Sequence, residues 1–168
     1  QAPFLRPPEL ATDTALALPT IQHAVAEMEK RLEKKYDIII MLQATSPFRL
    51  IEDIEVALAM MIEEHAEGCI SVVHVDNWHP MKMKRFQGNK LVDYEKPPIE
   101  NPPRQILPPV YMMNGAIFAT KRDVMMNKHT FQGDHCVGYI MPADRSFDID
   151  HEIDFAIAEE LIKRKQSQ

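Results

Sequence analysis

The sequence contains no run of about eighteen consecutive apolar residues, the length that a helix needs to cross a bilayer. Its start has no charged segment followed by an apolar stretch, so we expect no secretory signal. Thiols are few, because Cys69 and Cys136 are the only cysteines, and they lack CxxC spacing. These absences predict a cytoplasmic protein whose two thiols lie unpaired in apolar surroundings.

Positive charge is also scarce, since 19 Lys and Arg residues face 25 Asp and Glu residues, for a net charge of −6. A protein that binds nucleic acid generally needs a basic face, which disfavours that class. A phosphate-bearing small molecule remains compatible with the charge, because a metal ion can supply positive charge locally. With 168 residues and no internal repeat, we expect one domain over residues 1–168.

Helices and strands are predicted to alternate along the chain. Apolar residues at spacings of three and four predict the helices, and short apolar runs predict the strands. The strand-helix-strand order with short loops predicts a right-handed crossover and an α/β fold with a mainly parallel sheet. The first strand is a continuous apolar run, as expected for burial on both faces. Helices are expected at residues 20–35, 51–66 and 151–164, and strands at residues 36–42, 69–75, 111–120 and 137–141.

Residues 76–109 interrupt this alternation with many prolines and few core residues. Two short strands are predicted around residues 87–89. We interpret residues 76–109 as an arm that is inserted into the domain and packs on another subunit. The alternative is an exposed loop, but about thirty residues without structure would be unusual in a compact domain.

Polar side chains follow the first predicted strand, at residues 43–49. Ligands of open α/β sheets bind outside the carboxyl ends of the strands. Gln43, Thr45 and Ser46 offer an amide and two hydroxyls there, which suit a polyhydroxylated ligand. The alternative is that Thr45 or Ser46 only organises the turn or the start of the next helix.

Asp148 and Asp150 precede the last predicted helix. Residues two apart in extended backbone point to the same side, so both carboxylates can face one metal ion. Oxygen ligands of this kind suit Mg²⁺. The alternative is that Asp150 caps the helix beginning at His151, which leaves Asp148 unexplained.

Other candidate residues carry weaker signals. Asn114 and Gly115 lie within an apolar strand and mark either a plain bulge or a close approach to a ligand. Lys82 and Arg104 lie in the proline-rich segment and could bind a carboxylate, although most such residues are simply solvated. His129, His135 and Cys136 cluster in the sequence, but their spacing matches no zinc pattern, so we interpret them as structural or surface residues.

Six short motifs stand in order along the chain and together cover nearly all of it. Each alone is short enough to occur by chance, whereas the ordered set is specific. The motifs are Arg6-Pro7 with Glu9-Leu10-Ala11 and Asp13, residues 42–49 (LQATSPFR), residues 79–82 (HPMK), Arg104-Gln105, residues 114–118 (NGAIF), and residues 147–150 (FDID) followed by Glu152, Asp154 and Phe155.

This ordered set resembles the acylneuraminate cytidylyltransferase family, the CMP-sialic acid synthetases. The resemblance implies a Rossmann-like nucleotide-sugar transferase fold and a homodimer whose subunits exchange the arm. It also implies transfer of CMP from CTP to the anomeric hydroxyl of a sialic-acid-like nonulosonic acid, with release of pyrophosphate and Mg²⁺ as the cofactor.

The same resemblance assigns roles to individual side chains. Residues matching the sugar site are Gln43, Asn114 and Phe118, together with Lys82 and Arg104 of the arm, which would reach the sugar acid in the partner's site. Residues matching the nucleotide and metal sites are Arg6 for the nucleotide and the pair Asp148 and Asp150 for the catalytic metal.

The sequence departs from the family pattern at several positions. Phe118 stands where the family commonly has tyrosine, Ala44 replaces a proline, and Ala17 replaces a serine. The family's first strand and its basic, glycine-containing loop, which grips the triphosphate, have no counterpart here, so we expect an N-terminally truncated domain. Two alternatives stay open: a cytidylyltransferase for 3-deoxy-manno-octulosonate, and a catalytically incomplete homologue that binds a sugar or a partner protein.

Overall fold

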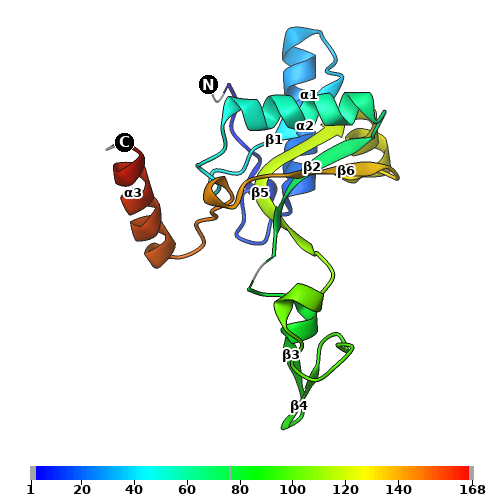
Figure 1. Ribbon diagram of the computed structural model, residues 1–168. Helices are drawn as coiled ribbons and strands as arrows, with labels where there is room; N and C mark the ends of the chain where they lie inside the picture. Colours follow the sequence, from blue (N-terminus) through cyan, green and yellow to red (C-terminus); the bar gives the residue numbers. More distant parts are fainter. Residues whose placement is uncertain (1–2, 76, 167–168) are drawn as a thin grey trace.

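A four-stranded sheet forms the centre of the computed structural model, which describes residues 3–75 and 77–166 (Figure 1). The strand order is β1-β5-β2-β6, and the α/β class is confirmed. Each of these predicted strands begins and ends within two residues of an observed strand. The strands are β1 (Ile38–Met41), β2 (Gly68–His74), β5 (Tyr111–Lys121) and β6 (Cys136–Ile140).

The strand directions correct the predicted mainly parallel sheet. In the described part of this sheet, β5 pairs antiparallel with both β1 and β2, while β2 and β6 form the one parallel pair. β1 and β2 do run in the same direction, as their connection through helix α2 (Ile51–Glu63) predicted. They are not neighbours, however, because β5 returns from the arm, enters the sheet from the opposite end and lies between them.

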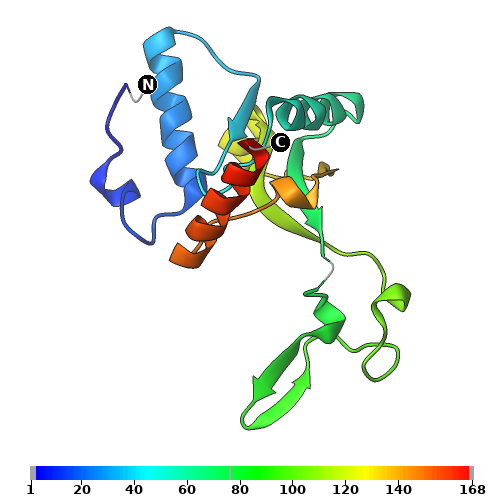
Figure 2. The ribbon, with the colours of Figure 1, turned by 60° about the vertical axis from the view of Figure 1, so that its left-hand side comes forward.

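Helices cover both faces of the sheet (Figure 2). α2 packs on β2, β5 and β6, while α1 (Ala17–Leu32) and the π-helical turn η4 (Val124–Lys128) lie on the other face. All four residues of β1 are only half-buried, which corrects the expectation of a strand covered on both faces, because β1 is an edge of the described sheet. The core residues are Ala57, Met61, Ala66, Cys69, Ala116, Ile117, Ala119 and Met141.

A bidentate ion pair ties α1 to the end of β5. Nε and Nη2 of Arg122 donate to the two carboxylate oxygens of Glu29, at 2.9 and 2.7 Å. The Tyr36 amide also donates to Glu29, so the chain leaving α1 is held at the same point. This ion pair lies at the end of the sheet where β1 begins, because Lys121 pairs with Ile38.

The arm leaves the sheet between β2 and β5 and extends away from it (Figures 1 and 2). Its tip is an antiparallel hairpin of β3 (Lys84–Gln87) and β4 (Lys90–Asp93), which are the two short strands predicted around residues 87–89. Buried His79 joins the two sides of the arm near its root. Nδ1 of His79 accepts a hydrogen bond from the Met81 amide, so Nε2 carries the proton and donates to the Pro108 carbonyl at 2.9 Å.

The last helix, α3 (Glu152–Gln166), lies to one side of the sheet (Figure 1). Among the described residues, no helix is both long enough and apolar enough to cross a membrane.

Both cysteines are free thiols, as predicted. Cys69 is buried, and this burial raises the pKa of its thiol to about 11, whereas Cys136 is half-buried.

Candidate functional site

Ser46 lies at the centre of a polar group beyond the carboxyl end of β1. Its side chain is fully buried, and its Oγ is 3.0 Å from the carbonyl oxygen of Asn114 and 3.3 Å from Oδ1 of Asp148. A hydroxyl has a single proton to donate, so it serves one of these acceptors at a time. Ser46 Oγ therefore lies between β5 and the segment that precedes α3 and can donate to either of them.

The loop that carries Ser46 is itself held by side-chain and backbone contacts. Nη1 of Arg49 donates to the carbonyl oxygens of Gln43 and Ser46, at 2.7 and 2.6 Å. Burial lowers the pKa of Arg49 from its ordinary value. The Thr45 carbonyl accepts a hydrogen bond from the Ile149 amide at 2.9 Å. The Arg49 side chain thus organises this turn, and the Thr45 backbone also holds the Asp148 segment.

Gly115 forms the plain bulge that was one of the two predicted alternatives, and its backbone closely approaches side chains of the protein itself, so the predicted approach to a ligand stays a prediction. The register between β2 and β5 shifts between Ile70 and Val72, and Gly115 has a φ of +74°. A Cβ at this position would lie 2.4 Å from Oε1 of Gln43 and 2.9 Å from Oγ of Ser46. The bare backbone of Gly115 therefore makes room for the Gln43 amide beside Ser46.

The side chain of Asn114 is buried and its amide has partners within the protein. Oδ1 accepts hydrogen bonds from Ser71 Oγ at 2.6 Å and from the Ala116 amide at 3.2 Å. Nδ2 donates to Ser146 Oγ at 2.9 Å. Asn114 consequently links β2 and β5 to the segment before α3, and the sugar contact predicted for it stays a prediction.

Asp148 and Asp150 occupy different environments. Asp148 is half-buried beside Ser46, whereas Asp150 is exposed and its carboxylate makes no hydrogen bond or ion pair to any described residue. Asp154 takes the helix-start role considered for Asp150, because its Oδ2 accepts hydrogen bonds from the amides of Asp150 and His151, at 3.1 and 2.8 Å. The capping alternative therefore does not account for Asp150.

Two carboxylates two residues apart fit the needs of Mg²⁺. This ion binds through one or two carboxylates and fills its other positions with water and substrate phosphates. Within residues 3–75 and 77–166, no three or more His, Cys, Asp or Glu side chains cluster as a metal-binding group. The donor set of Asp148 and Asp150 therefore fits Mg²⁺ shared with a substrate, and the described part of the chain holds no zinc-type cluster.

A buried carboxylate missed by the sequence analysis lies next to this group. Asp53, on α2, is 1% exposed and accepts hydrogen bonds from Arg145 Nε at 3.0 Å and Nη2 at 2.6 Å. Tyr139 and the Leu50 amide also donate to it, at 2.7 and 2.8 Å. Burial alone would raise the pKa of Asp53, but the hydrogen bonds from Arg145, Leu50 and Tyr139 lower it to about 2.

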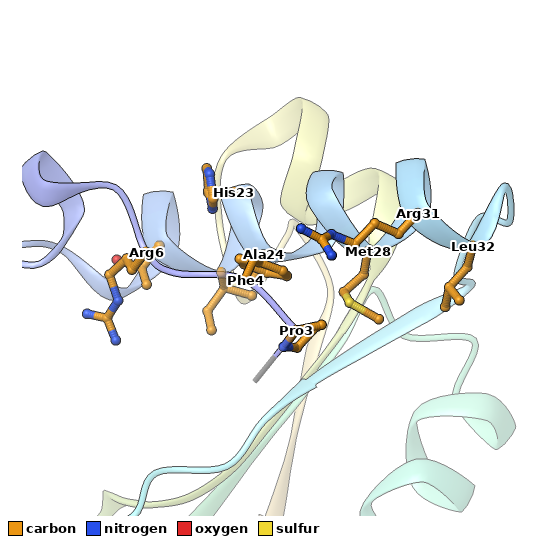
Figure 3. Close-up of a pocket in the computed structure, with 10 residues that line it drawn as sticks. Pro3, Phe4, Arg6, His23, Ala24, Met28, Arg31 and Leu32 are labelled. Carbon is orange, nitrogen blue, oxygen red and sulfur yellow. The ribbon is translucent and has the colours of Figure 1, made fainter. Parts of the chain in front are cut away.

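The remaining predicted residues lie outside the group around Ser46. Lys82 and Arg104 line separate hollows of the arm, of about 430 and 240 Å³. Phe118 packs its ring against Phe131, with the ring centres 5.9 Å apart. Arg6 lines a groove of about 770 Å³ between the N-terminal segment and α1, near Phe4 and other side chains labelled in Figure 3.

Comparison with known proteins gives several relatives. No protein-family model matches the chain. Post-translational flagellin modification protein B of Campylobacter coli is 30% identical over 165 residues, which are 98% of this chain and 69% of that protein. CMP-N,N'-diacetyllegionaminic acid synthase of Campylobacter jejuni is 30% identical over 162 residues, 96% of this chain and 68% of the relative. N-acylneuraminate cytidylyltransferase of Escherichia coli is 30% identical over 182 residues, 98% of this chain and 38% of the relative.

An α/β sheet with polar side chains gathered beyond a strand end is the arrangement in which such folds bind small polar ligands. The relatives define the family within that class. The chain belongs to the acylneuraminate cytidylyltransferase family.

The tight contact at Gly115 leads to a testable consequence. In Gly115→Ala, the new methyl group would displace the Gln43 amide and press on Ser46, in addition to the strain of a positive φ. We expect a loss of unfolding free energy of roughly 1–3 kcal/mol, measured by urea denaturation. Gly88→Ala is the matched control, because Gly88 has a φ of +61° and no atom within 4 Å of the added Cβ. Equal losses in the two variants would show that the contact with Gln43 and Ser46 has no energetic weight.

The low pKa of Asp53 predicts a pH dependence of stability. Because its folded pKa of about 2 lies below the unperturbed 3.8, Asp53 stabilises the fold above pH 3.8 and loses this effect as the pH falls toward 2. The full contribution is about 2 kcal/mol. Asp53→Asn should flatten this part of the curve of unfolding free energy against pH, measured by urea denaturation at a series of acidic pH values. The exposed carboxylate of Asp37 gives the control Asp37→Asn, which should keep the wild-type slope. A slope retained in Asp53→Asn would contradict the assignment.

Proposed function

We propose that the protein transfers CMP from CTP to the anomeric hydroxyl of a sialic-acid-like nonulosonic acid and releases pyrophosphate. The observation that carries the proposal is the convergence of Gln43, Asn114 and Asp148 around Ser46, beyond the carboxyl end of β1. Relatives named for CMP-N,N'-diacetyllegionaminic acid synthesis and N-acylneuraminate cytidylyl transfer support the same chemistry. A Rossmann-like nucleotide-sugar transferase fold is part of the proposal.

The chemistry needs an activated hydroxyl and a neutralised phosphate. Mg²⁺ held by Asp148 and Asp150 would supply both, by lowering the pKa of a bound hydroxyl and by balancing phosphate charge. The chain's own contribution is to place these carboxylates, and Ser46 holds one oxygen of Asp148. The Gln43 amide beside Gly115 would hold the sugar hydroxyls.

The basic residues of the proposal come from other parts of the molecule. Arg6 would contact the nucleotide from the N-terminal segment, and Phe118 would line the sugar site from β5. Lys82 and Arg104 are exposed in the arm. A lysine provides a point charge and an arginine a planar fork for the sugar's carboxylate.

We also propose that the protein is a homodimer in which residues 76–109 reach the partner. Within one chain, Lys82 and Arg104 do not join the group around Ser46, so a contact with the sugar from a second subunit fits their placement. The described residues of the arm carry large apolar side chains in solvent, an arrangement typical of an interface. The most exposed of these are Trp78, Phe86, Leu91 and Tyr94.

The metal-binding role of the two carboxylates is tested with the variants Asp148→Asn and Asp150→Asn of the whole protein. We expect each variant to lose pyrophosphate release from CTP while keeping its circular dichroism spectrum, because the amide is a poor Mg²⁺ ligand. EDTA should abolish release by the wild type. Glu159→Gln, an exposed carboxylate of α3, is the control and should keep full activity.

The sugar is identified in the same assay with parallel acids. N-acetylneuraminic acid and N,N'-diacetyllegionaminic acid represent the proposed class, and 3-deoxy-manno-octulosonate represents the alternative enzyme. If the protein prefers 3-deoxy-manno-octulosonate, the proposed nonulosonic acid class is wrong and the alternative enzyme is correct. Sugar binding without release from any of the three would favour the catalytically incomplete homologue.

Arm exchange is tested by mixing two inactive variants. A heterodimer of Asp148→Asn and Arg104→Ala subunits has one intact site only if the arm acts on the partner, since the unchanged arm of the first then meets the unchanged carboxylates of the second. We expect coexpression to restore up to half of the activity per dimer, measured by pyrophosphate release after tandem-tag purification. If the arm serves its own subunit, the purified heterodimer will remain inactive.

A further inference from the structure

Five consecutive residues before α3 are each held by a different contact. Arg145 is bound by Asp53 of α2, and Ser146 by Asn114 of β5. Phe147 packs edge-on against Phe48, with ring centres 6.2 Å apart. The contacts of the last two residues are those of Asp148 with Ser46 and of the Ile149 amide with Thr45.

The first of these contacts is the ionic one. Both oxygens of Asp53 are engaged by the guanidinium of Arg145, and Tyr139 of β6 donates a third hydrogen bond to the same carboxylate. A bidentate pair of this kind fixes orientation as well as distance. Since Arg145 is three residues from Asp148, this orientation constrains the path of the segment that leads to Asp148.

Stability alone does not require a charged pair at this place. Taking charges out of water costs solvation energy, here fully for Asp53 and in part for Arg145, whose side chain is 22% exposed, and well-packed apolar residues often stabilise a fold equally well or better. What an apolar pair lacks is directional contact. The geometry of the Asp53–Arg145 pair is therefore better explained by a need for placement than by a need for stability.

We propose that Asp53 and Arg145 are positioning residues that place the Asp148 carboxylate for its metal ion. This inference rests on the proposed metal role of Asp148 and Asp150. Asp53 acts through Arg145 and touches neither metal nor substrate. Tyr139 supports the pair from β6 and has the smaller role, because it contributes one neutral donor.

The test measures direct binding of Mn²⁺ to the whole protein. Binding is monitored by electron paramagnetic resonance, as the loss of the signal of the free ion. Variants Asp53→Asn and Arg145→Gln should each weaken Mn²⁺ binding by about 10-fold, the lower end of the range seen when direct contacts of metal ligands are removed, because neither side chain touches Asp148. The double variant should be no weaker than the single ones, because the two side chains act as one unit. Tyr139→Phe should give a smaller loss.

Arg122→Gln is the matched control, because it breaks a bidentate Arg–Glu pair at the other end of the sheet. It should lower stability in urea while leaving Mn²⁺ affinity unchanged. Equal Mn²⁺ affinity in Arg145→Gln and Arg122→Gln, with binding lost in Asp148→Asn, would overturn the positioning role and keep the metal site. If Asp148→Asn still binds Mn²⁺ as the wild type does, or if the wild type binds no Mn²⁺, the metal site is overturned and the positioning role with it.

Discussion

The arrangement around the proposed active site depends on one buried hydroxyl, that of Ser46. It lies within hydrogen-bonding distance of the β5 backbone and of the carboxylate that precedes α3, two segments that no regular pairing brings together. A buried polar group without a partner is costly, so the hydroxyl favours conformations in which at least one of these two acceptors stays within its reach. Gly115 completes the arrangement by leaving space for Gln43 at the same point.

Much of the fold could be predicted from local pattern. Apolar spacing located the helices and short apolar runs located the strands of the central sheet, because these patterns reflect which sides of each element are covered. The direction of β5 could not be predicted in this way. An apolar run reads the same for either direction, and the position of β5 between β1 and β2 depends on where the arm returns.

The candidate site was predictable where its residues follow strands or stand two apart, as with Gln43 and the aspartates 148 and 150. Asp53 was missed by the sequence analysis. Its partners Tyr139 and Arg145 lie 86 and 92 residues further along the chain, and no local spacing signals such contacts. Asn114 was found as a candidate, but its commitment to Ser71 and Ser146 required coordinates.

The two aspartates differ in freedom, and the difference has a mechanical consequence. Asp148 is tied to the body of the protein, while Asp150 is tied through Asp154 to the first turn of α3, which lies to one side of the sheet. A rotation of α3 therefore changes the separation of the two carboxylates. A cation held by both aspartates, as proposed, would favour one orientation of the helix, so its binding and the placement of the C-terminal helix would be thermodynamically linked.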